Sequence, residues 1–364
     1  MQINKSFWNK KNVLITGHTG FKGGWLTVLL NYLGSNIYGY ALNPVGEKNF
    51  FTLSKINKIL KKDYRKDITN LSSLKNCIKY SKPEIIFHLA AQSSVVESFK
   101  DSKKTILTNI IGTANILESI KNQPSVKCLV IITTDKVYQN YKISKYFTEE
   151  STLGGDDIYS GSKACCEILT NSYNKSFFWN NNVNIATARA GNCFGGGDWT
   201  KDRIVKDCLE AFFQNKTLFI RNPKANRPWQ HVVEPLTGYL ALAQKLCSSK
   251  GKKYSGAWNF GPSTKQNMRV INLAKLIKKT TKSKSRITIK KKDQRFTNKK
   301  FRVFESKYLN INSKKALKKL KWKSKLSIKS AVGLTVEWHQ ALIFKKDLLK
   351  ITLQQIKNYL SKNQ

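Results

Sequence analysis

Short apolar runs alternate with amphipathic segments through the first half of the chain. The apolar runs have the length of buried strands; they are Val13–Thr16, Ile37–Tyr40, Ile85–Leu89, Leu129–Thr133 and Asn184–Ala188. Helical spacing of apolar residues marks the segments Ser72–Tyr80, Thr105–Ile120 and Gly161–Asn174. This βαβ alternation predicts an α/β fold with a Rossmann-type, doubly wound parallel sheet.

The rhythm changes after Gly195, where Gly-, Pro- and Trp-containing loops precede predicted helices at Ile204–Gln214 and Pro235–Cys247. The stretch Lys275–Lys325 is rich in Lys but keeps helical apolar spacing, so we expect a folded surface region. With 364 residues, the chain is long enough for about two domains. We expect a larger domain at residues 1–192, with returning segments near 229–262, and a smaller domain at 193–228 and 263–364.

The charge changes this picture less than its size suggests. Lys and Arg total 65 against 22 Asp and Glu, a net charge of +43, which raises the alternative of a nucleic-acid-binding protein on a dehydrogenase fold. Only 9 of the 65 cations are Arg, whereas planar, bidentate contacts to nucleic acid favour Arg. No stripe of Arg and aromatic residues marks a reading surface. We therefore expect no nucleic-acid partner, and a basic surface that attracts anionic substrates.

A glycine-rich loop follows the first predicted strand and opens a helix. Gly17 permits a tight turn, Gly20 lets the backbone approach a pyrophosphate, and Gly23 allows close packing of helix and strand. The helix N-terminus then faces negative charge. The pattern predicts dinucleotide binding, although Asn43 stands where NAD-binding proteins usually carry an acidic residue, so the choice between NAD and NADP stays open at this point. Asp67 is placed to contact the adenine or, alternatively, is a surface carboxylate.

Candidate catalytic residues follow the fourth strand and open a later helix. Thr134 and Asp135 come directly after Leu129–Thr133, at the carboxyl edge of the sheet where ligands bind in this architecture. Tyr159 and Lys163 are four residues apart, on one helix face. An ammonium at that position can stabilise a tyrosinate and let the tyrosine act as a base.

Seven segments together resemble the extended short-chain dehydrogenases/reductases, and within them the CDP-glucose 4,6-dehydratases. These are GHTGFKGGWL (17–26), HLAAQ (88–92), TTDKVYQN (133–140), LGGDDIYSGSKA (153–164), ATARAGNCFGGGDW (186–199), IRNPKANRPWQHVVEPLTGYL (220–240) and WNFGP (258–262). The likeness runs from about Val13 to Trp338 and is looser in the last third, where Phe304–Ser306 and Asn312–Ala316 match in outline.

The resemblance implies a lyase that uses NAD and returns it unchanged. Tyr159 would take the C4 hydroxyl proton of the sugar with help from Thr134 and Lys163, hydride would pass to NAD, water would leave across C5–C6, and the hydride would return to C6. Asp135 would protonate the departing hydroxyl, and Lys136, where the dTDP-glucose enzymes have Glu, is a hypothetical base for C5. The implied cofactor contacts are Gly17, Thr19, Gly20, Phe21, Gly23, Asp67, Ile68, Ala90, Ala91, Gln92, Tyr159 and Lys163.

The arginines offer a separate argument about the substrate. Four of nine lie between Arg189 and Arg227, in a window rich in Gly, Asp, Pro and Trp. Bidentate recognition of a diphosphate explains why Arg is kept there in a Lys-rich chain. We expect the substrate contacts to be Gln92, Asn192, Asp198, Trp199, Arg203, Arg227 and His231, with Trp229 beside them or packed in the core.

The cysteines and the lack of metal-ligand or membrane-spanning patterns indicate where the protein works and what it binds. Seven scattered cysteines without a CxxC pair indicate reduced thiols in a cytoplasmic protein. No ligand spacing suggests a metal, and no apolar run suggests membrane insertion. The resemblance adds a homodimer that supplies deoxysugars for surface polysaccharide such as lipopolysaccharide O-antigen. The alternative within enzymes is an epimerase or dehydratase for another nucleotide sugar.

Overall fold

The structure, a computed structural model, describes residues 3–140, 146–263, 266–289 and 309–361. Its centre is a seven-stranded sheet in which every neighbouring pair of strands is parallel. In spatial order the strands are β12 (Gly256–Phe260), β7 (Asn184–Ala190), β5 (Cys128–Ile132), β4 (Ile85–His88), β1 (Asn12–Thr16), β2 (Asn36–Ala41) and β3 (Lys62–Arg65). The predicted doubly wound α/β sheet is confirmed.

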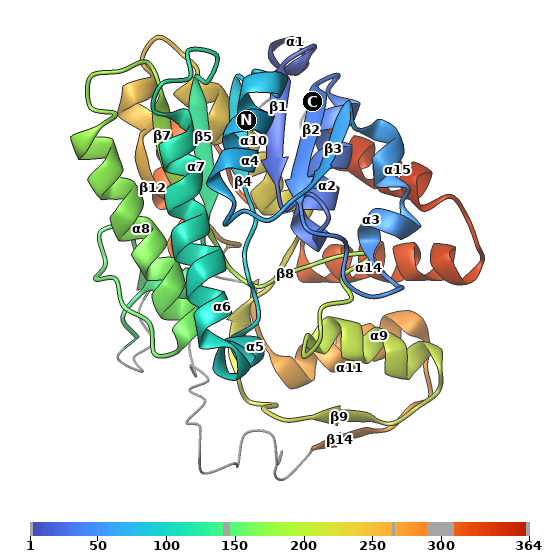
Figure 1. Cartoon of the computed structure of the whole chain (residues 1–364). Coiled ribbons are helices and arrows are strands. Elements are labelled where there is room, and N and C mark those ends of the chain that lie inside the picture. Colours follow the sequence, from blue (N-terminus) through green and yellow to red (C-terminus); the bar gives the residue numbers. More distant parts are fainter. Residues whose placement is uncertain (1–2, 141–145, 264–265, 290–308, 362–364) are drawn as a thin grey trace.

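Helices cover both faces of the sheet (Figure 1). Because successive strand residues point to opposite faces, Leu14 joins one core while Val13 and Ile15 join the other. On the Leu14 face lie α4 (Leu71–Ser81), α7 (Gly112–Ile120) and α8 (Ile158–Ser176); on the opposite face lie α2 (Phe21–Tyr32) and α10 (Val233–Leu246). The strands are buried on both sides, which explains their near-continuous apolar runs.

The five predicted strands and the predicted helices are all present, with small shifts at their ends. The segment Thr105–Ile120 is the least regular, because α6 (Ser102–Ile106) continues into a π-helical turn at Leu107–Ile111 (η2) before α7 begins. The short remaining elements of this half are α1 (Lys5–Trp8), α3 (Phe50–Leu53), η1 (Ile56–Ile59), α5 (Val95–Lys100), η3 (Asp135–Val137), β6 (Tyr146–Phe147) and η4 (Gly251–Tyr254).

A smaller lobe extends below the sheet (Figure 1) and carries two helices and short two-stranded pairings. The chain enters it after β7, through β8 (Cys193–Phe194), which pairs with β11 (Gln230–His231). The lobe contains α9 (Ile204–Phe213), β9 (Leu218–Ile220), β10 (Asn226–Pro228), β13 (Asn267–Arg269), α11 (Val270–Thr281) and β14 (Ile287–Ile289).

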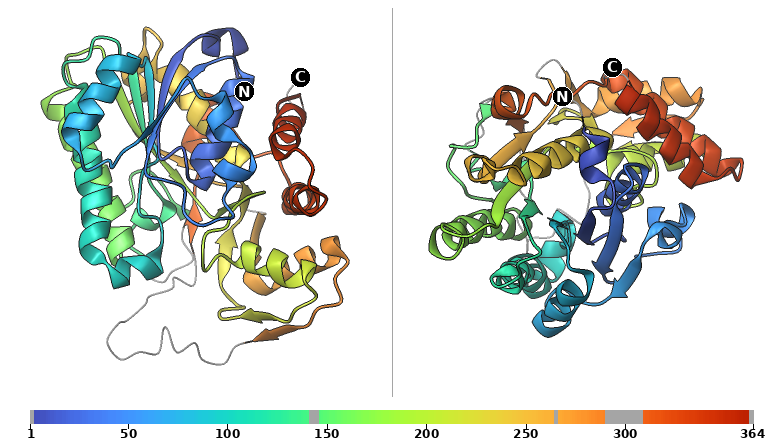
Figure 2. Two further views of the ribbon diagram at one scale, coloured as in Figure 1. Left: turned by 45° about the vertical axis from the view of Figure 1, so that its right-hand side comes forward. Right: turned by 90° about the horizontal axis from the view of Figure 1, so that it is seen from above.

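The last described segment returns to the sheet layer. It forms β15 (Asn310–Ile311), α13 (Lys314–Leu320), α14 (Ile328–Ile343) and α15 (Leu348–Ser361). Figure 2 shows α14 and α15 beside the large half rather than within the lobe, and α15 packs on α2. The division of the chain into an NAD-binding domain and a smaller nucleotide-sugar-binding domain, which the resemblance implies, stays a prediction. Within it, residues 348–361 were expected in the smaller domain, but they pack on α2 of the sheet layer.

Parts of the Lys-rich stretch are folded in α11 and α13, while 290–308, with Phe304–Ser306, lie outside the described residues. All seven cysteines are free thiols; of the adjacent pair on α8, Cys166 is buried and Cys165 is exposed. Among the residues described, no helix combines the length and hydropathy that a bilayer crossing requires.

Candidate active site

The glycine loop lies between β1 and α2, against the end of β4. Gly17 adopts φ +77°, and a Cβ there would lie 2.7 Å from the backbone nitrogen of Ala90. A Cβ on Gly23 would lie 2.2 Å from the carbonyl oxygen of Gly17, so the first turn of α2 closes directly on the loop. Gly20 has only an ordinary contact at 3.4 Å. The strand order reverses between β2 and β4 on either side of β1, so the loop lies at the switch point where such sheets bind ligands.

The loop is tied to β3 by a buried histidine. His18 Nε2 lies 2.9 Å from Asp63 Oδ1, and Arg65 donates to Asp63 Oδ2 at 2.7 Å. Burial acts to raise the pKa of Asp63, but the hydrogen bonds from His18 and Arg65 outweigh burial and hold that pKa below its ordinary value. The Thr19 hydroxyl donates to the carbonyl of Leu42 at 3.1 Å, which fixes the loop after β2.

Thr134, Asp135 and Lys136 lie at the carboxyl end of β5, on the short helix η3. The Thr134 hydroxyl donates to Asp135 Oδ1 at 3.1 Å, while the buried Asp135 Oδ2 has no partner within the described residues. Burial raises the pKa of Asp135 to about 6, against the opposing charge of Lys136. Burial lowers the pKa of Lys136, and the carboxylate of Asp157 acts in the opposite direction.

Tyr159 and Lys163 face this strand end from the first turns of α8, and both side chains are buried. Lys163 Nζ donates to the carbonyl of Ile132 at 3.1 Å. Burial raises the pKa of Tyr159, while a hydrogen bond with Thr134 and the charges of Arg203 and Lys22 act to lower it. The five predicted catalytic residues therefore meet at one place.

Lys22 is a site residue that the sequence reasoning missed. It lies in the first turn of α2, hydrogen-bonds the thiol of Cys193, and its charge acts on Tyr159 and Asp135. A cation inside a phosphate-binding loop, one residue before Gly23, is the signal that could have indicated it.

A buried ion pair behind the catalytic residues was also missed. Glu167, two turns after Tyr159 on α8, accepts hydrogen bonds from Thr133 (2.5 Å), Thr187 (2.5 Å) and both Nε and Nη2 of Arg189 (3.0 and 2.9 Å). Both charged side chains are 3% exposed. The helical spacing of Tyr159, Lys163 and Glu167 places them on one face, and that spacing was the available signal.

This finding corrects the diphosphate explanation for the retained arginines. Arg189 donates two hydrogen bonds to Glu167 in a bidentate pair and a further one to the Tyr138 hydroxyl at 2.8 Å, so its guanidinium pairs with a carboxylate and not with a diphosphate. Arg221 forms an ion pair with Asp202 at 3.4 Å. Arg203, at the N-cap of α9, and Arg227, on β10, remain predicted substrate contacts, and their charges reach Tyr159 and Asp135 respectively.

A polar network links α8 to the strand end of β4. Asn109, in the π-helical turn, accepts from the backbone of Gln92 at 2.9 Å and donates to the Ser162 hydroxyl at 2.8 Å. His88 lies 2.7 Å from the Thr16 hydroxyl and 3.3 Å from that of Thr113. Burial lowers the pKa of His88 to about 3, which favours the neutral imidazole held between these two hydroxyls.

Several predicted contacts have side chains with partners inside the protein. The amide of Gln92 donates to Ser94 and Thr105, and its oxygen accepts from the Ser94 backbone. Asp67 Oδ1 accepts from both the backbone and the hydroxyl of Thr69. A binding role for either side chain would require exchanging these hydrogen bonds, so both remain predictions. Ile68 is buried, while Phe21, Ala90 and Ala91 are half-buried around the loop.

The predicted substrate residues after β7 are spread over the lobe entrance. Asn192 and Asp198 are half-buried, and Asp198 accepts from the Thr200 backbone at 3.1 Å. Trp199 packs edge-to-face on His339 of α14, with ring centroids 4.7 Å apart. His231 is buried against Trp25 and Phe194, and burial lowers its pKa to about 3. Trp229 is buried and donates to the Met268 carbonyl, as the packing alternative expects.

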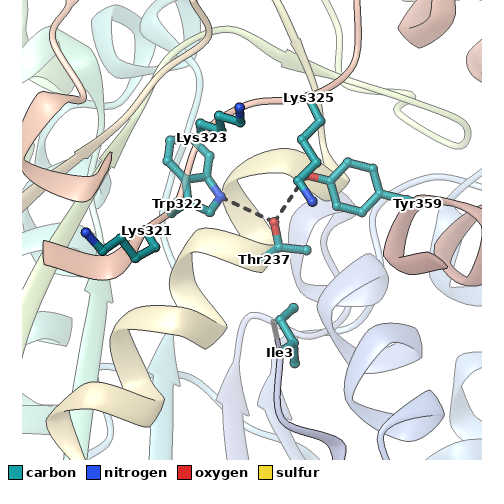
Figure 3. A pocket seen from close by; sticks show the side chains of 7 residues that line it. All are labelled: Ile3, Thr237, Lys321, Trp322, Lys323, Lys325 and Tyr359. Atoms are coloured by element: carbon teal, nitrogen blue, oxygen red, sulfur yellow. Dashed lines mark hydrogen bonds between the residues drawn. The ribbon is translucent and has the colours of Figure 1, made fainter. Parts of the chain in front are cut away.

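Among the hollows in the described part of the chain, two small pockets differ in what lines them. The first, shown in Figure 3, lies between α10, the segment before α14, and α15. There Trp322 Nε1 approaches the Thr237 hydroxyl at 3.3 Å, away from all predicted site residues. The second is polar and is lined by Lys136, Tyr138, Asn140, Asp156, Asp157, Ser160 and Leu309. The residues that the structure describes contain no cluster of metal-ligating side chains.

Comparison with known proteins agrees with this geometry. The model of the family "GDP-mannose 4,6 dehydratase" matches residues 14–335. A CDP-glucose 4,6-dehydratase of Salmonella typhimurium is 37% identical over 365 aligned residues, covering 99% of each chain. A dTDP-D-glucose 4,6-dehydratase of Dictyostelium discoideum is 26% identical over 59% of this chain and 51% of its own.

Solved structures share the fold. A UDP-glucose 4-epimerase of Thermotoga maritima, with UDP-glucose, superimposes with a TM-score of 0.78 at 20% identity, covering 91% of this chain and 99% of its own. A dTDP-glucose 4,6-dehydratase of Bacillus anthracis, in complex with NAD, gives 0.74 at 22% identity, covering 93% and 99%. With the whole-length relative and the family model in agreement, the chain belongs to the nucleotide-sugar dehydratase family that the GDP-mannose 4,6-dehydratase model describes, within the extended short-chain dehydrogenases/reductases.

Proposed function

We propose that this protein is a CDP-glucose 4,6-dehydratase, which converts CDP-D-glucose to CDP-4-dehydro-6-deoxy-D-glucose and water. The observation that carries the proposal is the meeting of Asp135 and Lys136, at the end of β5, with Tyr159 and Lys163 of α8. The choice of CDP-glucose as the substrate rests on the relative named CDP-glucose 4,6-dehydratase, which matches over the whole length of the chain. A 4-epimerase has no water to expel and gives Asp135 no task.

The glycine loop fits NAD. Gly17 and Gly23 let the loop, the end of β4 and the first turn of α2 pack closely, because a Cβ at either position would clash with backbone at 2.7 and 2.2 Å. The N-terminus of α2 then presents its free amides beside the loop. Bound NAD would accept hydride from C4 of the sugar and return it to C6. The residues proposed to hold it are Gly17, Thr19, Gly20, Phe21, Gly23, Asp67, Ile68, Ala90, Ala91, Gln92, Tyr159 and Lys163.

Tyr159 is the proposed base for the C4 hydroxyl, with Thr134 sharing that hydroxyl. A buried tyrosine resists ionisation, so cations must offset burial for the phenolate to form. Arg203 and Lys22 act in that direction in this chain. Lys163, fixed to the Ile132 carbonyl, is proposed to orient the nicotinamide ribose.

Asp135 and Lys136 are proposed to carry the elimination. Once C4 is a ketone, the C5 proton becomes acidic. A pKa of about 6 leaves Asp135 able to protonate the C6 hydroxyl near neutral pH. Burial favours the neutral amine of Lys136, which is the form that can remove the C5 proton. The diphosphate and sugar would contact Asn192, Asp198, Trp199, Arg203, Arg227, His231 and Gln92.

A homodimer is part of the proposal. The outer sides of α6, η2 and α8 expose large apolar side chains, of which Ile106, Leu107 and Ile111 are 41–42% exposed and Ile168 is 56% exposed. Apolar residues on neighbouring helices indicate a protein partner surface, and a second copy would pack the same surface of its own α6, η2 and α8 there. The molar mass in analytical ultracentrifugation, with Ile168→Glu as the disrupting variant, tests this pairing.

We also propose that the enzyme works in the cytoplasm and supplies deoxysugars for surface polysaccharide such as lipopolysaccharide O-antigen. Its seven free thiols suit a reducing compartment. A 4-keto-6-deoxy sugar is suited to consumption by reductases and aminotransferases that act at the ketone.

Incubation with CDP-, dTDP-, GDP- and UDP-glucose in the presence of NAD tests the function. The proposal expects a 4-keto-6-deoxy product, lighter by one water, from CDP-glucose at the highest kcat/KM. Product from dTDP-glucose alone would refute the nucleotide, and formation of CDP-galactose without water loss would establish an epimerase. RNA binding with a steep salt dependence and no turnover would favour the nucleic-acid alternative.

A further inference from the structure

Charged groups face Lys136 from four elements. Asp135 precedes it on η3 and Asp157 approaches from the start of α8, while Arg227 of β10 and Arg203 at the start of α9 oppose them. Lys136 and Asp157 also line one small polar pocket. Asp156 and Tyr138 line it too, but the Tyr138 hydroxyl is engaged by Asn259 and Arg189.

Asp157 is held in place by the helix that it caps. Its Oδ1 accepts from the backbone of Ser160 at 2.9 Å, and its Oδ2 accepts from the Ser160 hydroxyl at 2.7 Å. These bonds fix the carboxylate two residues before Tyr159. The same side chain therefore belongs to the start of the catalytic helix and to the wall of the pocket beside Lys136.

Asp135 and Asp157 differ in whether they carry a negative charge when the elimination begins. If Asp135 is the acid of the elimination, it is uncharged at the start of that step. Asp157, whose charge acts on Lys136 more strongly than that of Asp135, then supplies negative charge against two arginines, and Asp156 also lines the pocket. An Asn at this position would cap the helix about as well, so the cap alone does not require a carboxylate.

We propose that Asp157 is a positioning residue for dehydration, whose fixed carboxylate orients Lys136 in the pocket and stabilises the ammonium that forms when Lys136 takes the C5 proton. This inference rests on the proposed function. The C5–H bond breaks, its electron pair forms the C5–C6 double bond, and the C6–O bond breaks as Asp135 gives its proton to the leaving hydroxyl. When C6 is reduced, the Lys136 ammonium returns its proton to C5. The proton that Tyr159 took from the C4 hydroxyl is then passed to Asp135, directly or through water, so protons balance over the whole cycle.

Asp157→Asn tests the proposal, because it keeps a capping oxygen and removes the charge. Competitive acetylation of the holoenzyme with acetic anhydride across pH, read by peptide mass spectrometry, gives the titration midpoint of Lys136. We expect the midpoint to fall by about 1 pH unit, since the loss of an opposite charge beside a titratable group lowers its pKa by that order. Asp101→Asn is the matched control, because Asp101 caps α6 in the same way through the Lys104 backbone at 2.8 Å. It should leave the midpoint unchanged.

Kinetics provide the second readout. In Asp157→Asn, the acid limb of the kcat profile should move to lower pH by the same amount, with kcat lower by about three- to tenfold and KM for CDP-glucose unchanged. Asp157→Glu, which restores the charge, should recover part of kcat. If Asp157→Asn does not fold, Asp157→Ser replaces it as a neutral cap.

The two readouts separate the two hypotheses. An unshifted Lys136 midpoint in a folded neutral variant overturns the role of Asp157, whatever the enzyme turns over. A shifted midpoint without dehydration of CDP-glucose leaves the electrostatic pairing in place and refutes the proposed function instead.

Discussion

The buried pair of Glu167 and Arg189 gives the sharpest stability prediction. Glu167→Gln keeps the shape of the side chain but leaves the guanidinium, 3% exposed, without a counter-charge. Removing one partner of a buried pair costs about 3–5 kcal/mol. With an unfolding entropy of roughly 2.1 cal/mol/K per residue, that loss lowers the melting temperature of this 364-residue chain by about 4–7 °C.

Calorimetry and urea titration measure this effect, and a second variant tests its cause. Adding Arg189→Met to Glu167→Gln removes the orphaned charge, so the double variant should regain most of the lost stability. The exposed pair of Lys100 and Glu97 is the control, with side chains 65% and 52% exposed; Glu97→Gln should change the unfolding free energy by less than about 1 kcal/mol. A loss below about 1 kcal/mol in Glu167→Gln, or a double variant less stable than the single one, would contradict this account.

Three further predictions concern the loop, the acid and the thiols. Gly23→Ala should abolish NAD binding in fluorescence titration, because its Cβ would lie 2.2 Å from the Gly17 oxygen, whereas Gly333→Ala on α14, with nothing within 4 Å, should raise the unfolding free energy by roughly 1 kcal/mol and leave binding intact. Asp135→Asn should stop dehydration yet stabilise the fold at pH 7 by up to ~3 kcal/mol. The folded pKa of Asp135, about 6, lies above its ordinary 3.8, so the wild type loses stability as pH rises through 6 and the gain should vanish near pH 4 in denaturation curves; a constant gain at all pH values would count against this origin. In the Ile168→Glu variant, which should be monomeric, Cys165 is exposed and should react first with Ellman's reagent, and adding Cys165→Ser should remove the fast phase without changing the slow one.

The sheet could be predicted from the sequence because strands that are buried on both faces consist of continuous apolar runs. Runs such as Leu129–Thr133 are apolar throughout, and the turn chemistry after Val13–Thr16 is local. The π-helical turn at Leu107–Ile111 could not be predicted, since nothing in its apolar spacing distinguishes it from an α-helix.

The site was predictable to the extent that it depends on short spacings. Thr134, Asp135, Tyr159 and Lys163 lie within 30 residues of one another and at recognisable positions of the fold. The partner of Arg189 was not predictable in the same way, because Glu167 meets it only through the packing of α8 on β7. A retained Arg shows that bidentate geometry is needed, but not whether a phosphate or a carboxylate uses it.

The packing of α15 on α2 has a consequence for how activity arises during synthesis. Every proposed catalytic residue has been synthesised once Lys163 is made, yet the helix that carries the glycine loop still lacks the cover supplied by Ile356 and Tyr359. β12, the edge strand beside β7, also comes nearly a hundred residues later, at Gly256–Phe260. For more than half of its translation, the nascent chain therefore contains all the proposed catalytic residues while apolar side chains of α2 and the edge of β7 remain uncovered. Because exposed apolar surface and unpaired strand edges favour aggregation, this is the interval in which the chain most needs protection from it.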